Sequence, residues 1–332
     1  MLQPALTRAW QRRGPLSTAL LPLAWLIACL SAAHRWGYAI GLLRVHRLPV
    51  PVIVVGNVVA GGAGKTPTVL GVVAHLRARG LRPGIVSRGY GGQHTAATEV
   101  QAASPPALVG DEPLLLLRAS GVPVVVGRDR LQAGYLLLQA HPDITHIVCD
   151  DGMQHYRLFR DIEICVFDAR GVGNGRLLPA GLLRQPWPRS AVAAAGQSPD
   201  RLLVVKTGPS SLPGHLANRA LAPEARNGHG ETRPLLALQH TGSPLHALAG
   251  IAQPENFFAM LRACGLQLQQ TESLPDHYDF DSYSRNRDRR ETLICTEKDA
   301  TKLWAHRPDA WAVPLVQTLP PGFLAALDAL LA

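Results

Sequence analysis

The stretch Pro51–Val73, which reads PVIVVGNVVAGGAGKTPTVLGVV, constrains the fold of this chain more than any other. An uncharged, β-branched run at Val52–Val55 leads into a loop dense in glycine, and Lys65 and Thr66 then begin an apolar run that can form a helix. A strand, a glycine loop and a helix that begins with Lys-Thr are together typical of a P-loop, which binds the phosphates of a nucleotide. The stretch therefore predicts an α/β fold.

We expect this loop to bind ATP together with Mg²⁺. Glycine admits backbone angles that a side chain forbids, so successive N–H groups can point into one concavity. The residues expected to do so are Gly61, Gly62, Ala63 and Gly64. Lys65 would reach the β and γ phosphates, and the Thr66 hydroxyl would bind Mg²⁺. Val59 stands where the first glycine of such loops is usual. A glycine-rich turn without a chemical role is the alternative, but the flanking strand and helix favour phosphate binding.

Composition favours a two-domain protein with an anionic partner. The chain has 332 residues, of which 47% are hydrophobic and 17% charged, so it can bury a large core. The net charge of +9 suggests a phosphorylated substrate or an acidic membrane surface. The basic residues seldom form runs and lack interleaved aromatic residues, which argues against nucleic acid as a partner. The five cysteines have no CxxC spacing and fit reduced core residues of a cytosolic protein.

Residues 14–33 carry no charge, and their length is close to the roughly 20 residues that span a bilayer. A cleaved signal peptide would export a nucleotide-dependent enzyme away from ATP, and Pro15 and Pro22 weaken a spanning helix. A helix or hairpin in the membrane interface fits best, because basic residues flank the apolar stretch and aromatic residues in and beside it can lie at the headgroup level. These residues are Arg8, Trp10, Arg12, Arg13, Trp25, Arg35, Trp36, Tyr38, Arg44 and Arg47. We therefore expect residues 1–35 to lie on a membrane rather than cross it.

A second strong motif is the apolar run HIVCDD, His146–Asp151, which ends in two carboxylates. A strand that ends in adjacent acids is typical of the Walker-B partner of a P-loop, which holds Mg²⁺ directly or through water. Such a run can arise by chance. Its place after a P-loop in an alternating strand–helix chain favours a functional role for Asp150 and Asp151.

Three further loops carry candidate polar residues. The motif SRGYGG presents Arg88 and Tyr90 at the end of a strand, where ligands of open α/β sheets bind, although a surface turn would read the same. The motif GDEP, with Asp111 and Glu112, begins a leucine-rich helix, where acidic residues commonly just complement the helix dipole. The long loop 171–188 is a candidate anion-binding lid because arginines occur in and beside it. These arginines are Arg170, Arg176 and Arg184.

The pattern divides the chain into four parts. Residues 1–35 form the apolar membrane segment, and residues 36–208 form a P-loop lobe of alternating strands and helices. Residues 209–234 are rich in Pro, Gly, Ala and Asn without periodicity and are typical of a linker. Residues 235–332 restart the strand–helix alternation and predict a second, smaller α/β lobe.

The ordered set of motifs resembles the tetraacyldisaccharide 4′-kinase family over nearly the whole chain. The motifs are GGAGKTP, SRGYGG, GDEP, CDDGMQH, LLPAGLLRQP, GIAQPENFF, LPDHYDF and TEKDATK. The resemblance implies a P-loop kinase of two α/β/α sandwich lobes with a membrane-associated N-terminal helix. It implies ATP-dependent phosphorylation of the 4′-hydroxyl of a tetraacylated glucosamine disaccharide 1-phosphate in lipid A biosynthesis. The expected location is the cytoplasmic face of the inner membrane of a Gram-negative bacterium.

The resemblance also implies roles for individual residues. It makes Asp111 of GDEP the catalytic base and His277 of LPDHYDF its paired histidine. This chemistry fits, because a sugar hydroxyl attacks phosphorus well only when a carboxylate accepts its proton. A histidine on the second lobe could orient Asp111 as the lobes close, although a loop histidine that packs on Phe280 is the alternative.

Metal and substrate roles follow from the same resemblance. The expected metal ligands are Thr66, Asp150, Asp151 and Glu112. The expected contacts to phosphate or sugar are Arg88, Tyr90 and Arg184. At Gln185 the chain departs from the family, which usually has glutamate there, so a charged role at that position is in doubt.

Two other functions compete with the kinase. A P-loop GTPase would fit the unusual loop, but guanine recognition normally needs an NKxD sequence, and neither VKTG at 205–208 nor TEKD at 296–299 supplies it. Competition between ATP and GTP would separate these two. A non-catalytic membrane scaffold that binds ATP is the other candidate, and it leaves GDEP and LPDHYDF without a purpose.

Overall fold

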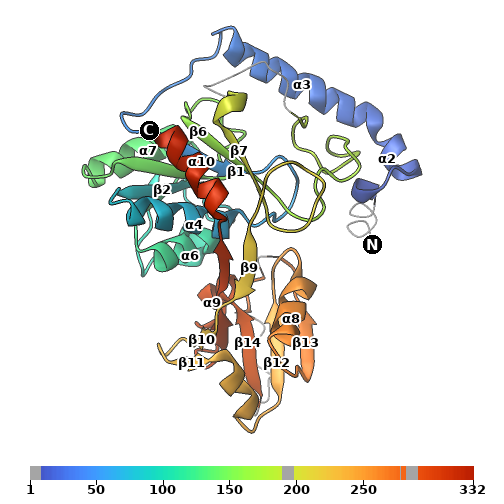
Figure 1. Ribbon diagram of the computed structural model, residues 1–332, viewed down its shortest axis with the longest axis vertical. Helices are drawn as coiled ribbons and strands as arrows, with labels where there is room; N and C mark the ends of the chain where they lie inside the picture. The colour runs from blue at the N-terminus through green and yellow to red at the C-terminus, as the bar shows by residue number, and fades with distance from the viewer. Residues whose placement is uncertain (1–8, 189–197, 277, 282–290) are drawn as a thin grey trace.

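The computed structural model describes residues 9–188, 198–276, 278–281 and 291–332. The chain forms two α/β lobes, one above the other in Figure 1, with strand β9 between them. Helix α3 lies along the outer edge of the first lobe. The predicted α/β class with a larger first lobe and a smaller second lobe is confirmed.

The first lobe is built on an eight-stranded sheet in the order β3-β4-β2-β5-β1-β6-β7-β8. All pairs are parallel except β3 with β4. The central strands are short β-branched runs buried on both faces, as parallel sheets require. The strands are β1 Val52–Gly56, β2 Pro83–Ser87, β3 Thr98–Glu99, β4 Val124–Val126, β5 His146–Asp150, β6 Ile162–Phe167, β7 Leu202–Lys206 and β8 His215–Leu216.

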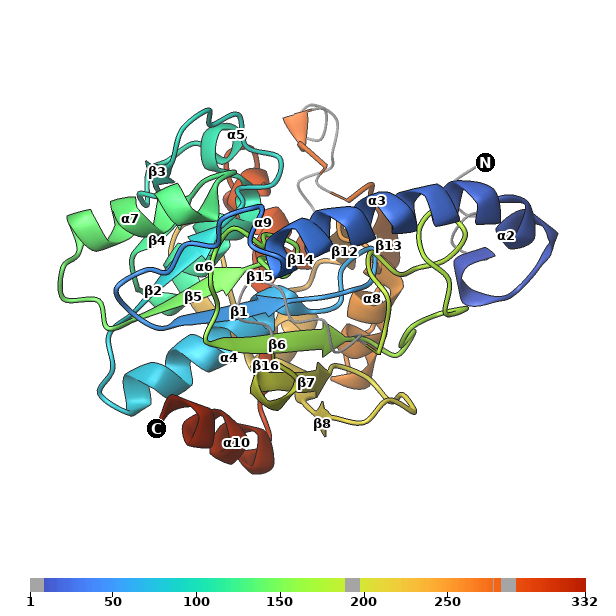
Figure 2. The ribbon, with the colours of Figure 1, turned by 90° about the horizontal axis from the view of Figure 1, so that it is seen from above.

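Helices cover both faces of this sheet. Figure 2 shows α4 and α10 on one side and α7 on the other. Crossovers between parallel strands are right-handed, so connections that run in opposite directions along the sheet put their helices on opposite faces. The helices of this lobe are α4 Lys65–Ala78, α5 Pro106–Val109, α6 Asp111–Ser120, α7 Arg130–Ala140 and α10 Pro321–Leu331, with a 3₁₀ turn at Pro199–Arg201. The predicted α/β/α sandwich is confirmed.

The second lobe has a six-stranded sheet in the order β11-β10-β15-β14-β12-β13. Its core is separate from that of the first lobe and centres on Phe258, Leu261 and Ile294. The strands are β10 Glu224–Arg226, β11 Thr232–Pro234, β12 Leu245–Ala249, β13 Gln270–Ser273, β14 Thr292–Thr296 and β15 Trp311–Val313. The helices are α8 Pro254–Ala263, α9 Glu297–Leu303 and the 3₁₀ helix Leu235–His240.

The two lobes are joined by an antiparallel ribbon of β9, Asn218–Leu221, and β16, Leu315–Thr318. The predicted linker 209–234 is therefore wrong as a description of an unstructured connector. It contains β8, which completes the first sheet, β9 of the ribbon, and β10 and β11 of the second sheet. These strands have two to four residues each, too few for a periodic pattern to be visible in the sequence.

The last helix also lies outside the predicted boundary. Phe323 and Leu327 of α10 belong to the core of the first lobe, not of the second. The second lobe therefore does not extend to residue 332 as predicted. The sequence shows that α10 has an apolar face, but not which of two lobes that face covers.

The N-terminal segment forms α2, Pro15–Ala19, and α3, Leu21–Ala39. The first lobe holds α2 through polar contacts: Ser17 Oγ donates to Ala180 O at 2.5 Å, and Asn174 Nδ2 donates to Ser17 Oγ at 2.9 Å. Apolar side chains of α3 stay exposed, with Trp25 at 65% and Leu30 at 63%. Across the described part of the chain, no helix combines the length and apolar character needed to span a bilayer.

Candidate active site

The P-loop, residues 57–64, joins the carboxyl end of β1 to α4. Gly61 and Gly64 have φ angles of +88° and +87°, which favour glycine. A Cβ at Gly64 would lie 1.8 Å from a guanidinium nitrogen of Arg219 and 3.1 Å from the Thr207 methyl group. The backbone conformation therefore favours glycine immediately before Lys65, and a side chain there would also have to displace the Arg219 guanidinium.

The valine in place of the usual first glycine has a structural explanation. Val59 is buried and forms an antiparallel bridge with Leu183. The neighbouring Ala60 N donates to Leu182 O at 2.8 Å, and Arg184 N donates to Val58 O at 2.7 Å. This side of the P-loop therefore pairs with the LLRQ segment as neighbouring β-strands do. A β-branched residue such as valine suits that pairing. The pairing also brings Arg184 to the P-loop.

Lys65, the first residue of α4, faces the residue that follows β5. Its Nζ lies 3.5 Å from Asp151 Oδ1, and Arg184 Nη1 lies 3.5 Å from the same oxygen. Burial alone would raise the pKa of Asp151, but the charges of Lys65, Arg184 and Arg130 outweigh it and lower that pKa. Asp151 has a φ of +50°, and Arg130 Nη2 holds its carbonyl at 3.1 Å. The predicted P-loop and Walker-B residues therefore meet.

Asp150, the last residue of β5, is a buried carboxylate with one unsatisfied oxygen. Its Oδ2 accepts from Ser87 Oγ at 3.0 Å, whereas the buried Oδ1 has no hydrogen-bond partner among the described residues. Burial, followed by the nearby Glu112 and Asp151, raises the pKa of Asp150 to about 7. An oxygen ligand that lacks a partner in a negative surrounding suits a hard cation such as Mg²⁺.

The predicted metal ligands do not form a complete cage. Within the described ranges, no three His, Cys, Asp or Glu side chains are grouped so that they could hold a metal ion. Mg²⁺ usually takes only one or two carboxylates from a protein and completes its shell with water and substrate phosphates. The donor set therefore fits a magnesium ion that arrives with the nucleotide.

The motifs SRGYGG and GDEP interlock through their glycines. A Cβ at Gly110, whose φ is +93°, would lie 2.8 Å from Tyr90 O, and one at Gly92 would lie 2.6 Å from Leu108 O. This backbone packing puts Asp111 at the first turn of α6, next to the loop that carries Arg88 and Tyr90. Both of these side chains are exposed, so they can meet a ligand.

The carboxylate of Asp111 is only 3% exposed and has both oxygens engaged. Its Oδ1 accepts from the backbone N–H of Glu112 at 3.0 Å, and its Oδ2 lies 3.3 Å from Lys302 Nζ of α9. Glu112 Oε1 is 3.1 Å from Lys298 Nζ on the same helix. Sequence reasoning missed both lysines. Their four-residue spacing in TEKDATK, which puts them on one helix face, was the available signal.

The second lobe also reaches the P-loop from another side. Gln253 Nε2 donates to Asp168 Oδ2 at 3.3 Å, and Asp168 also pairs with Arg170 at 2.7 Å. The nearest atom to a Cβ at Gly61 would be Arg170 Nη1, at 3.4 Å. Of the three lid arginines, Arg170 and Arg184 therefore stand at the site. Arg176 instead donates to Ser17 and Thr18 of α2, so it anchors the N-terminal segment.

The predicted histidine, His277, lies outside the described residues. Its chain neighbours lie beside the α9 lysines: Asp276 Oδ1 is 3.0 Å from Lys298 Nζ, and Tyr278 O accepts from Lys302 Nζ at 3.5 Å. Asp276 and Tyr278, the residues before and after His277, therefore contact the same two lysines that contact GDEP.

Gln185, where the family usually has glutamate, is buried. Its Oε1 accepts from Tyr156 Oη at 3.2 Å. The Tyr156 ring lies against His34 and Tyr38 of α3, with centroids 5.9 and 6.0 Å away. A neutral amide satisfies this hydrogen bond without burying a charge. Position 185 therefore connects the residues after β5 to the N-terminal helix.

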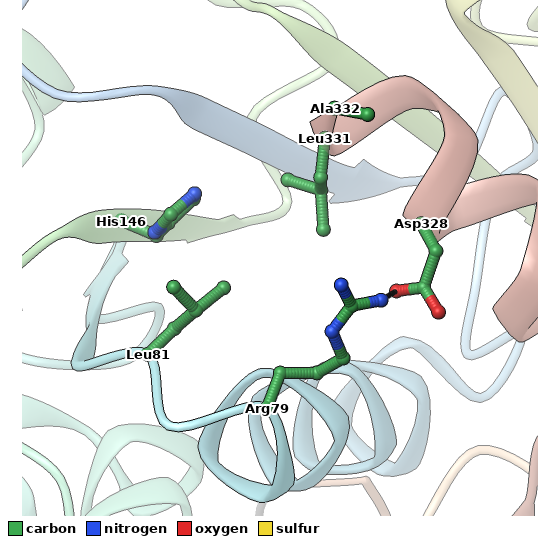
Figure 3. A pocket seen from close by; sticks show the side chains of 6 residues that line it. All are labelled: Arg79, Leu81, His146, Asp328, Leu331 and Ala332. Carbon is green, nitrogen blue, oxygen red and sulfur yellow. Dashed lines mark ion pairs between the residues drawn. The ribbon is translucent and has the colours of Figure 1, made fainter.

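A pocket of about 180 Å³ lies at the opposite end of the sheet. Figure 3 shows its lining side chains, with Arg79 and Asp328 paired at 2.6 Å across one side and His146 from the start of β5 across from them. Ligands of open α/β sheets bind at the carboxyl ends of the strands, so this pocket is not the nucleotide site.

Comparison with known proteins gives one family. The model of the family described as LpxK, tetraacyldisaccharide-1-P 4′-kinase, matches residues 16–332. A tetraacyldisaccharide 4′-kinase of Acidovorax sp. (strain JS42) is 56% identical over 333 residues, covering 100% of this chain and 95% of its own. That of Delftia acidovorans is 50% identical over 326 residues, covering 97% and 93%. The crystal structure of the "apo" form of LpxK from Aquifex aeolicus in complex with ATP superposes with a TM-score of 0.79 at 27% identity, covering 96% of this chain and all of that one.

Proposed function

This chain belongs to the tetraacyldisaccharide-1-P 4′-kinase family, and we propose that it transfers the γ-phosphate of ATP to the 4′-hydroxyl of a tetraacylated glucosamine disaccharide 1-phosphate, a lipid A precursor. The observation that carries the proposal is the meeting of Lys65 with Asp151 beside the buried Asp150. A phosphate-binding lysine and a carboxylate with a free oxygen are the two elements that position ATP and its magnesium ion.

The nucleotide end of the site uses the P-loop. Backbone N–H groups at Gly61, Gly62, Ala63 and Gly64 surround the phosphates, and the N-terminus of α4 adds partial positive charge. Lys65 turns from Asp151 to the β and γ phosphates as they enter. Asp150 and the Thr66 hydroxyl would hold Mg²⁺, and Asp151 and Glu112 would support it directly or through water. When bound, the ion would neutralise negative charge on the phosphates.

The acceptor end uses Asp111. Its carboxylate takes the proton of the 4′-hydroxyl as the bond from that oxygen to the γ-phosphorus forms. The bond from the γ-phosphorus to the bridging oxygen breaks, and ADP leaves with the electron pair. His277 orients Asp111 from the second lobe. Because Asp111 is almost fully buried and is contacted on both oxygens, by Glu112 N and by Lys302 Nζ, its carboxylate holds one orientation.

Substrate contacts come from three residues around the carboxyl ends of the strands. Arg184, which already shares Asp151 with Lys65, contacts the transferring phosphate. Arg88 and Tyr90, exposed beside GDEP, contact the sugar or its phosphate. An arginine suits phosphate because its planar fork donates two parallel hydrogen bonds.

The N-terminal segment associates with a membrane. Exposed apolar side chains of α3 would be buried among the acyl chains, and arginines before and after the helix would attract anionic headgroups. A surface-lying helix also brings a lipid acceptor to the site, since Tyr38 of α3 packs on Tyr156 near the Walker-B segment. The expected surface is the cytoplasmic face of the inner membrane of a Gram-negative bacterium.

Transfer of label from γ-labelled ATP to the purified lipid A disaccharide 1-phosphate tests the function. We expect a labelled lipid phosphorylated at the 4′ position, formed only with Mg²⁺ present. Labelling from γ-labelled GTP should be slower than labelling from γ-labelled ATP. A protein that binds ATP but transfers no label to the lipid would be a scaffold. Preference for GTP would support the GTPase alternative.

A further inference from the structure

We propose that Lys302 is a positioning residue for Asp111, supplied by the second lobe. This role rests on the proposed function of Asp111 as the base. It goes further because it assigns the orientation of the base to a cation on a different lobe, in addition to the histidine.

Two charged pairs join α9 of the second lobe to the start of α6 of the first lobe. Lys302 Nζ lies 3.3 Å from Asp111 Oδ2, and Lys298 Nζ lies 3.1 Å from Glu112 Oε1. The two lysines are four residues apart on α9, and the two acids are adjacent at the start of α6. Each lysine therefore contacts a different acid of GDEP.

Contacts within the second lobe hold helix α9, and with it the two lysines, in place. Asp299 lies between the two lysines in the sequence, and its side chain is buried. It accepts from Gly250 N at 3.1 Å and from Thr296 Oγ1 at 2.6 Å. Thr296 in turn caps the helix by accepting from Asp299 N at 3.2 Å. Ala300 and Leu303 are buried in the core of the second lobe. The backbone position of Lys302 is thus determined by packing within the second lobe, not by its contact with Asp111 of the first lobe.

Among the described residues, two contacts of Asp111 act on different oxygens of its carboxylate. The Oδ1 hydrogen bond comes from the next residue of its own helix, so by itself it constrains only one oxygen of the carboxylate. The Oδ2 contact to Lys302 adds a second anchor from a different direction. Since Asp111 is 3% exposed, water offers little replacement for a lost cation. Lys302 therefore holds the Asp111 carboxylate in one orientation, and removing the lysine would let that carboxylate rotate.

The charged groups around Asp111 indicate that Lys302 orients its carboxylate rather than only balancing its charge. From α9 it is faced by Lys302, by Lys298 and by the carboxylate of Asp299, and on its own helix Glu112 is adjacent. Lys298 is shared between Glu112 and Asp276. Of the two lysines, Lys302 is the one within 4 Å of the Asp111 carboxylate.

Steady-state kinetics of Lys302 variants test the proposal, with the full-length protein and ATP and lipid acceptor varied separately. Lys302→Ala should lower kcat by about 10²-fold, the cost of a misplaced catalytic group, with the KM for ATP within a few-fold of wild type. Lys302→Arg should recover at least about ten-fold of that loss, because it restores a cation. Arg118→Ala, which removes a cation from the far end of α6, is the control and should leave kcat unchanged.

The double variant separates this proposal from the proposed base. If Lys302 acts through Asp111, Asp111→Asn with Lys302→Ala should be no slower than Asp111→Asn alone. Multiplicative losses, or a lowered melting temperature without rescue by Lys302→Arg, would overturn positioning while leaving the base intact. Near-wild-type turnover of Asp111→Asn would instead remove the base and this role with it.

Discussion

Lys65 Nζ lies 3.5 Å from Asp151 Oδ1, so the P-loop lysine is paired with the carboxylate that directly follows β5. Lys65 is the side chain best placed to neutralise charge on the transferring phosphoryl group. Lys65→Ala should therefore lower kcat by at least about 10²-fold, in line with the loss of one preorganised stabiliser. Turnover assays under saturating ATP measure this. Turnover close to wild type would remove the P-loop from the mechanism.

The free oxygen of Asp150 makes a second prediction, about magnesium. Asp150→Asn keeps the hydrogen bond from Ser87 Oγ within reach but weakens a ligand to the ion. The Mg²⁺ concentration needed for half-maximal turnover should rise by about ten-fold or more. Ser87→Ala is the matched control, since it removes the hydrogen bond and keeps the carboxylate, and should have the smaller effect. An unchanged Mg²⁺ requirement in Asp150→Asn would exclude Asp150 as a ligand.

A third prediction concerns the membrane. Replacing Trp25 and Leu30 on α3 by serine should weaken binding to anionic phospholipid vesicles by roughly 10²-fold or more, since each fully buried apolar side chain is worth about 1.5–3 kcal/mol. Nucleotide binding should be unchanged. Vesicle sedimentation gives the partition coefficient. Leu236→Ser, at an exposed leucine of the second lobe, is the control. Equal binding of both variants would put the anchor elsewhere.

A fourth prediction uses the buried Asp299 of α9. Burial raises the pKa of Asp299 from 3.8 to about 6, although its hydrogen bonds to Thr296 and Gly250 act the other way. The folded protein then holds a proton between about pH 4 and pH 6 that the unfolded chain has lost. Folding free energy should therefore weaken as pH rises through that window, by about 3 kcal/mol at most. Denaturant unfolding at pH 4 and pH 7 measures it.

Asp299→Asn supplies the comparison for that pH effect. It keeps an oxygen that can accept from Gly250 N, but it does not titrate. The unfolding free energy of Asp299→Asn should gain on that of wild type as the pH rises from 4 to 7. A constant difference between the two proteins over this range would show that Asp299 does not change its protonation.

The nucleotide half of the site could be predicted from sequence because its signals are local. The P-loop and the Asp150-Asp151 pair each lie within a few residues at the end of one strand. Parallel strands bring their carboxyl ends to one edge, so β1 and its neighbour β5 bring these two motifs together. Local sequence sufficed there.

The remainder depends on contacts between distant parts of the chain. Lys302 meets Asp111 only because α9 of one lobe packs on α6 of the other, and nothing near either residue indicates this. Val59 replaces a glycine because Leu183 pairs with it. Phe323 follows the second lobe in the sequence but packs in the core of the first lobe. Sequence patterns describe which faces are apolar or charged, but not which partner they meet.

The role of Asp111 as base is the central claim, and single-turnover phosphoryl transfer by Asp111→Asn tests it most directly. With enzyme in excess over labelled ATP and saturating lipid acceptor, transfer should be slower than wild type by about 10²–10⁴-fold, the usual contribution of a general base. The dissociation constant for ATP should stay within a few-fold, and adding His277→Ala should slow transfer little further. Transfer within about ten-fold of wild type would contradict the account. A large loss of ATP affinity would instead assign Asp111 to the metal and its phosphates.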